Sequence, residues 1–200
     1  MSREFSPTVS RPAIRWRCLR QVVIIKPWII LETEYLHPNI RVDKCELPNG
    51  QIIAPHLLQY DHEIMVFALT KKQEVVLIKQ YRHGVQKIIL ELPGGSVDEG
   101  ESPLQAAKRE LMEETGYASD TFIEVGYGSP NPAIYTNTIY SFLALDVEQT
   151  GKQSAYDAET VEISLVSLDE FITMAKQGDL IHSLNISTLF YVLKYLNRIS

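Results

Sequence analysis

The order of apolar and polar residues along the chain predicts two groups of short strands. Toward the N-terminus, short apolar runs separated by turn residues cover 21–25, 28–31, 40–45 and 51–54. The Asn49-Gly50 pair between the last two runs is a strong hairpin signal, so we expect a small antiparallel sheet there. Further apolar or alternating runs, typical of strands that are buried on one or both faces, cover 63–69, 74–80, 87–92, 122–126, 138–145 and 161–166.

The first predicted helix follows a glycine-containing loop. Ser102, Pro103 and Gln105 fit the N-cap, first and third positions of a helix that ends at Thr115, and Gly116 supplies the left-handed stop. On this helix the apolar residues at helical spacing form one stripe. We expect three of them to be buried: Leu104, Ala107 and Leu111.

Two more helices are predicted near the C-terminus. Ser167 and Glu170 form the capping-box pair of a helix that ends at Gly178, and the last helix covers 185–198. Strands followed by helices predict an α/β (α+β) fold, with a mixed β-sheet sandwiched between helices and a small N-terminal antiparallel sheet. We divide the chain into an N-terminal strand segment, residues 1–55, and a larger domain, residues 56–200. On the last helix we expect these apolar residues in the core: Ile186, Leu189, Phe190, Leu193 and Leu196.

Composition narrows the class of protein. Two hundred residues with 45% hydrophobic content are enough for one sizeable core. No apolar stretch approaches the length of a membrane span and the polar N-terminus lacks a secretion signal, so we expect a cytoplasmic protein without a membrane partner. Cys18 and Cys45 are expected to be reduced. The net charge of −6 disfavours nucleic acid as a partner but is compatible with a small anionic substrate.

The most specific pattern lies between Gly94 and Tyr117, where a glycine loop leads into the first helix. Glu113 and Glu114 follow Glu110 by three and four residues, which places all three on one face of that helix. Three like charges repel, and a bound cation turns the repulsion into binding. Carboxylates suit a hard ion, so we expect Mg²⁺, with Mn²⁺ as the alternative. A solvated helix face is the other interpretation of a run of glutamates.

The complete spacing, with Glu101 in the loop and Arg109 before Glu110, resembles the signature of the Nudix hydrolase family. The resemblance implies a Nudix fold, with Glu110 and Glu114 as direct metal ligands. It implies that Glu113 binds water or a second ion, and that the carbonyl of Gly94 is a further metal ligand. Glu101 and Arg109 are implied to pair and to steady the metal-binding carboxylates. The backbone at Gly95 is expected to approach the substrate closely.

Residues 75–101 look like the ADP-ribose pyrophosphatase branch of this family, and a weaker resemblance extends from about residue 16 to 195. It implies that Arg82 contacts the substrate diphosphate, for which a guanidinium fork is suited. The alternative is an exposed charge at a strand end. Pro132 lies in a stretch, 129–132, where the branch carries Ser-Pro-Gly, and we place it at the substrate. Asn131 replaces the usual glycine, and 133–140 lacks the branch's acidic residue.

The same resemblance assigns roles outside the signature. Asp157 aligns with the base that activates water and Glu159 with a further metal ligand, although a solvated acidic loop is the other interpretation of 156–162. Glu162 is expected to face solvent. In this branch the N-terminal sheet mediates a homodimer, and its aromatic side chains stack on adenine. Trp28 is the first candidate for that platform and Trp16 the second, a partly buried core position being the alternative.

Together these residues predict Mg²⁺-dependent hydrolysis of a nucleoside diphosphate linked to another group. The resemblance favours ADP-ribose as the substrate, with AMP and ribose 5-phosphate as the products. GDP-mannose or another sugar nucleotide is the alternative substrate. A catalytically inactive sensor of nucleotide ligands is the alternative of another class.

Overall fold

The larger of the two main sheets is built around β5 (Glu63–Leu69), in a computed structural model that describes residues 26–153 and 161–199. Six other strands join β5: β6 (Glu74–Arg82), β7 (Lys87–Glu91), β8 (Gly94–Ser96), β10 (Thr121–Gly128), β11 (Ile139–Leu145) and β13 (Glu162–Ser167). The main path runs β10-β11-β5-β6-β13, while β7 pairs with β6 and β8 with β5. Only β11 and β5 are parallel, so the sheet is mixed as predicted.

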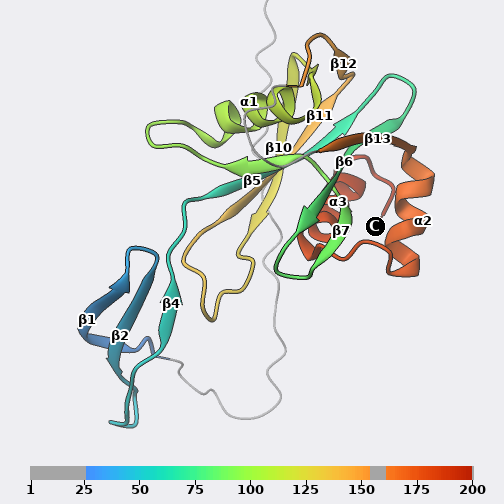
Figure 1. Ribbon diagram of the computed structural model, residues 1–200. Helices are drawn as coiled ribbons and strands as arrows, with labels where there is room; N and C mark the ends of the chain where they lie inside the picture. Colours follow the sequence, from blue (N-terminus) through green and yellow to red (C-terminus); the bar gives the residue numbers. More distant parts are fainter. Residues whose placement is uncertain (1–25, 154–160, 200) are drawn as a thin grey trace, which may run out of the picture.

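Both faces of β5 are buried, because helices cover each side of the sheet (Figure 1). Ile64, Val66 and Ala68 form one core with α1 (Pro103–Thr115). The alternate residues of β5 form the second core with α2 (Leu168–Gln177) and α3 (Ser183–Tyr195). The side chains of a strand alternate between faces, so one apolar run supplies both layers. The predicted sheet between helices is confirmed.

The helix ends follow their capping residues. At α1 the Ser102 side chain accepts the Gln105 N–H and the Gln105 side chain accepts the Ser102 N–H, which is a complete capping box. Gly116 closes this helix at a φ of 71°, a conformation that favours glycine. At α2 the Ser167 hydroxyl accepts the Glu170 N–H, the hydroxyl half of the predicted box. The sequence therefore sets these boundaries locally.

Three predicted core residues are exposed in the structure. Leu104 is 40% exposed because it follows the exposed loop 98–100, and the sheet buries α1 only from Ala106 onward. Ile186 and Phe190 are 39% and 55% exposed. The face of α3 that meets the sheet instead contains Asn185, Thr188, Leu189 and Val192. Polar residues enter that face because they find partners there: Asn185 bonds backbone atoms of residues 90 and 92, and Thr188 bonds the Ser141 hydroxyl.

The smaller sheet consists of β1 (Ile29–His37), β2 (Ile40–Glu46), β3 (Ile52–Ile53) and β4 (His56–Leu58), and it lies apart from the larger sheet (Figure 1). β2 and β3 are antiparallel across a turn in which Gly50 has a φ of 82°, so the predicted hairpin is confirmed. This sheet continues to Leu58, and the division of the chain at residue 55 stays a prediction. The strand expected at 21–25 and residues Trp16 and Cys18 lie outside the described residues.

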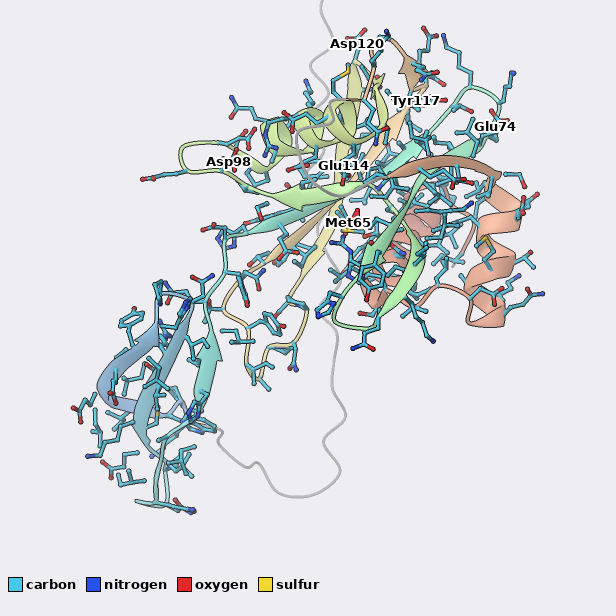
Figure 2. All side chains as sticks on the ribbon, in the orientation of Figure 1. Met65, Glu74, Asp98, Glu114, Tyr117 and Asp120 are labelled. Carbon is cyan, nitrogen blue, oxygen red and sulfur yellow. The ribbon has the colours of Figure 1, made fainter. Side chains whose placement is uncertain are left out.

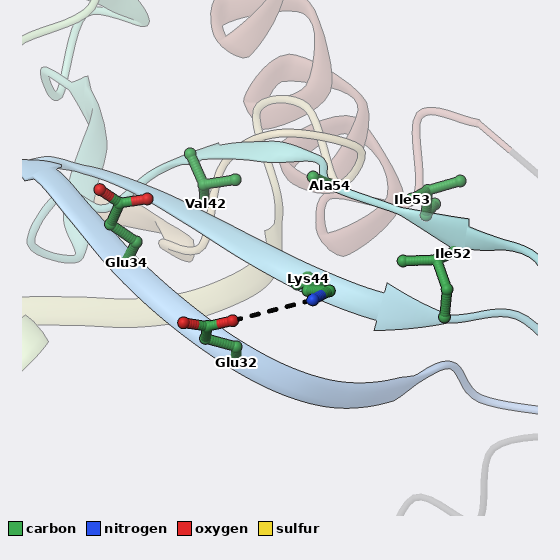
Figure 3. A pocket seen from close by; sticks show the side chains of 7 residues that line it. All are labelled: Glu32, Glu34, Val42, Lys44, Ile52, Ile53 and Ala54. Atoms are coloured by element: carbon green, nitrogen blue, oxygen red, sulfur yellow. Dashed lines mark ion pairs between the residues drawn. The ribbon is translucent and has the colours of Figure 1, made fainter.

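One face of the smaller sheet carries an open hollow of about 340 Å³. Glu32 and Lys44 face each other on it at 4.0 Å, and Figure 3 shows this pair beside the apolar side chains of Val42 and Ile52. The hollow is lined entirely by residues 32–54, so it belongs to the smaller sheet and not to the carboxylate helix. A short ladder of β9 (Tyr117–Ala118) and β12 (Glu148–Gln149) completes the strands. Across the described ranges, no helix has the length and apolarity of a membrane span.

Candidate active site

The glycine loop seats the carboxylates of α1 against the sheet. The Gly94 N–H donates to Glu114 Oε2 at 2.8 Å, and Figure 2 shows Glu114 where α1 meets the larger sheet. A Cβ added at Gly95 would lie 2.5 Å from Glu110 Cδ and 2.8 Å from Glu110 Oε2. Only a residue without a side chain leaves room for the Glu110 carboxylate in this position. The two predicted metal ligands are thus both in contact with the loop.

Arg109 ties the loop to the helix. Its Nε and Nη2 donate to the two Glu101 oxygens at 3.1 and 2.8 Å, and Nη2 also donates to the Ser96 carbonyl at 2.9 Å. Its Nη1 donates to Glu110 Oε1 at 2.7 Å and to Glu113 Oε2 at 3.2 Å. The predicted contact between Glu101 and Arg109 is present, in the forked geometry that only arginine offers. The guanidinium therefore fixes where the Glu110 carboxylate points.

Burial leaves the two carboxylates on α1 short of compensating charge. The pKa of Glu114 is raised to about 7, mainly by burial and also by the charge of Glu110, although the hydrogen bond from the Gly94 N–H opposes the rise. Burial also raises the pKa of Glu110; the Arg109 hydrogen bond and charge lower it, while the charges of Glu113 and Asp98 add to the rise. A dication beside these side chains would offset both effects. Their hard oxygen donors fit magnesium or manganese.

The side chains of residues 26–153 and 161–199 contain no ready-made group of three or more His, Cys, Asp or Glu ligands. Glu110 Oε1 is occupied by Arg109 and Glu114 Oε2 by the Gly94 N–H, which leaves one oxygen of each carboxylate available. Magnesium usually takes one or two protein carboxylates and completes its shell with water and substrate phosphate oxygens. The donor set therefore fits such an ion.

A second ionic cluster lies beside Glu114. Arg82 Nε contacts Glu91 Oε2 at 2.7 Å, and His182 Nδ1 approaches Glu91 Oε1 to 2.6 Å. The charges of both Arg82 and Glu91 act on the pKa of Glu114, so the cluster adjoins the carboxylates of α1. Glu63 faces the same region, since burial raises its pKa while the charges of His182 and Arg82 lower it. Positive charge thus lies next to the predicted metal ligands.

Two other predicted site residues are exposed. Pro132 lies in the turn after β10, and Trp28, 52% exposed, lies directly before β1 of the sheet that is apart from α1 (Figure 1). Asp157 and Glu159 lie outside the described residues. Glu162 faces solvent as predicted, where it pairs with Lys79.

Sequence reasoning missed Glu91, His182 and Glu63 as members of this region. Glu91 had a signal, because it is the one charged residue within the apolar run 88–92, and a charge in such a run needs a buried partner. His182 and Glu63 had none, since the contacts that bring them here come from distant parts of the chain.

The chain is similar to several known proteins. A family model described as the NUDIX domain matches residues 60–184. A methanol dehydrogenase activator from Bacillus methanolicus is 29% identical over 155 residues, 77% of this chain and 84% of that protein. An ADP-ribose pyrophosphatase from Bacillus subtilis (strain 168) is 27% identical over 142 residues, 70% and 77% of the two chains. A solved structure described as an ADP compounds hydrolase has a TM-score of 0.79 and 21% identity, and the match covers 88% of this chain and 97% of that one. At that identity the structure supports the fold alone.

Proposed function

The chain belongs to the NUDIX domain family and is a Nudix hydrolase, and from this premise we propose that it hydrolyses ADP-ribose to AMP and ribose 5-phosphate with magnesium. The observation that carries the hydrolytic part is the set of contacts that Gly94, Gly95 and Arg109 make with Glu110 and Glu114. The choice of substrate is supported by the name of the Bacillus subtilis relative and by the placement of Arg82 next to these carboxylates.

In the proposed mechanism Glu110 and Glu114, with the Gly94 carbonyl, would hold magnesium. When bound, the ion would neutralise the diphosphate and make an attacking water more acidic. Arg109 and Glu101 keep the Glu110 carboxylate aimed, and Arg82 binds diphosphate oxygens. The water attacks one phosphorus, the bridging P–O bond breaks, and each product keeps one phosphate.

The remaining roles are proposed from the family resemblance. Asp157 accepts the proton of the attacking water, and Glu159 adds a metal ligand. Glu113 holds water or a second ion, a role compatible with its position at the exposed edge of the Arg109 cluster. Gly95 and Pro132 lie along the substrate.

A panel assay tests this function. Purified protein with magnesium is incubated with ADP-ribose, GDP-mannose, NADH, diadenosine polyphosphates and coenzyme A, and the released phosphomonoester is measured. The proposal expects the highest kcat/KM for ADP-ribose. A preference for GDP-mannose would assign the protein to the sugar-nucleotide alternative, and no turnover of any compound together with tight binding would support the sensor.

We also propose a homodimer formed through the smaller sheet. All nine residues of β1 are exposed, and Ile29, Ile30 and Leu36 are each more than half exposed. Within the described ranges β1 is an edge strand that pairs with β2 alone. An exposed apolar edge strand of this length promotes association unless another surface covers it.

Changing Leu31 to Asp is expected to convert the dimer to a monomer, because a charge placed on an apolar contact loses hydration without gaining a partner. Sedimentation velocity measures the mass of each species. Glu32→Ala, on the same strand, is the matched control and should leave the dimer intact. A wild-type protein that sediments as a monomer at tens of micromolar contradicts the dimer.

Trp28→Ala tests the proposed adenine platform. Because the smaller sheet lies apart from α1 in one chain, Trp28 would serve the site of the second copy. Loss of base stacking is expected to weaken binding of a non-hydrolysable ADP-ribose analogue by about tenfold, from the usual 1–3 kcal/mol per stacked base. Isothermal titration measures the affinity, and unchanged affinity in a protein that is still dimeric ends this idea.

A further inference from the structure

We propose that Glu91 and His182 are positioning residues that hold Arg82 toward the substrate diphosphate. This inference rests on the proposed function, because it requires that Arg82 contacts the substrate. It adds two residues, one from β7 and one from the start of α3, to which the family signature assigns nothing. Neither residue is proposed to touch the substrate.

The Glu91 side chain is only 2% exposed and uses both oxygens. Oε2 accepts from Arg82 Nε at 2.7 Å, and Oε1 lies 2.6 Å from His182 Nδ1. Burial raises the pKa of Glu91, but the contacts with His182 and Arg82 outweigh burial, so the pKa stays below its usual value. An ionised carboxylate is therefore retained inside the protein, where it needs its partners Arg82 and His182.

Arg82 is held by two buried side chains, Glu91 and Gln80, and is itself partly open to solvent. Glu91 accepts from its Nε, whereas the arginine side chain as a whole is 44% exposed. The amide of Gln80 also packs against the guanidinium, with its oxygen within 2.7–3.0 Å of all three nitrogens in the amide orientation that satisfies both groups. Each outer nitrogen carries two N–H donors, so Nη1 and Nη2 retain donors beyond the contact with Gln80. That arrangement suits a side chain that receives phosphate oxygens in pairs.

The start of α3 also contacts the segment that leads into the glycine loop. His182 is the N-cap residue of α3. Asn185, one turn later, accepts the Leu92 N–H at 3.1 Å and donates to the Leu90 carbonyl at 3.2 Å. These bonds fix the backbone on both sides of Glu91, directly before the loop at Gly94. The start of α3 thus sets the position of Arg82 relative to the Glu114 carboxylate.

Charge neutralisation of the anchor tests the proposal. Glu91→Gln keeps the shape but removes the charge that orients Arg82, and we expect KM to rise by about tenfold with a smaller change in kcat. His182→Gln, at a less buried position, is expected to have the same pattern with a smaller effect. Glu162→Gln is the matched control. It breaks the exposed ion pair with Lys79, which lies on β6 as Arg82 does, and it should leave KM and kcat unchanged.

A double-mutant cycle separates positioning from a general effect on folding. If Glu91 acts through Arg82, Glu91→Gln raises KM in the wild-type background but has little further effect in Arg82→Ala. The same cycle with His182→Gln covers the case in which the buried Glu91 variant does not fold. Equal effects in both backgrounds overturn the inference, and so does an unchanged KM in both single variants. The cycle is run on whichever panel diphosphate the wild type hydrolyses best, so a failure with ADP-ribose counts against the proposed function and not against this anchor.

Discussion

Replacing Glu114 with Gln is expected to lower kcat by at least about 100-fold while the protein stays folded. Loss of residues that only support metal ligands already costs 10–100-fold, and Glu114 is proposed to be a ligand itself. Glutamine has nearly the same shape and retains an oxygen that can accept the Gly94 N–H, so the loop has no reason to move. Steady-state kinetics with saturating magnesium measures the effect. Activity within a few-fold of wild type would remove Glu114 from the chemistry.

Stability of the metal-free protein provides the control for the same variant. Burial raises the pKa of Glu114 to about 7, from an ordinary value of 4.5. The folded state therefore binds this proton more tightly than the unfolded state, and the associated stability is lost as pH rises from 4.5 through 7. In EDTA, the free energy of unfolding of wild type should fall over that range by on the order of 3 kcal/mol more than that of Glu114→Gln. Urea titrations at pH 5 and 8 measure the free energy of unfolding of both proteins. An equal change between the two pH values in wild type and Glu114→Gln would contradict the raised pKa of Glu114.

Gly95→Ala is expected to lower kcat/KM by about 100-fold with little change in stability. The added methyl would overlap the Glu110 carboxylate, which is the free end of a flexible side chain and is able to rotate away. Folding is therefore preserved, whereas the carboxylate leaves its place beside Glu114. A displacement of about 1 Å at such a site is enough for losses of this size. Activity and thermal unfolding are measured on the same preparation.

Two other glycines give the comparison. A Cβ at Gly84 would meet no atom within 4 Å, so Gly84→Ala should keep both activity and stability. At Gly94 the added atom would overlap the Ile64 carbonyl of β5, which is part of the backbone and has no way to yield. Gly94→Ala should therefore lose stability as well as activity. If Gly95→Ala instead keeps its activity as Gly84→Ala does, the close fit between the glycine loop and Glu110 is not needed for activity.

Local signals in the sequence determined the elements that depend only on near neighbours. Ser102 and Gly116 set the two ends of α1 because caps act within one turn. The Asn49-Gly50 pair marked the hairpin between β2 and β3 because Gly50, at a φ of 82°, closes the turn that begins at Leu47. The spacing from Glu110 to Glu114 determined which carboxylates gather on one helix. A helix of fixed pitch places such residues together wherever it packs.

Only the tertiary structure decided which residues of the helices and strands pack against one another. The apolar stripe in the sequence of α3 predicted Ile186 and Phe190 in the core, but the buried face contains Asn185 and Thr188. Buried polar groups are accepted there because distant backbone and hydroxyl groups form hydrogen bonds with them. Glu91 meets His182, 91 residues later, for the same reason. Periodicity reports which side chains share a face, whereas the partner of that face is set by how strands and helices from separate parts of the chain pack together.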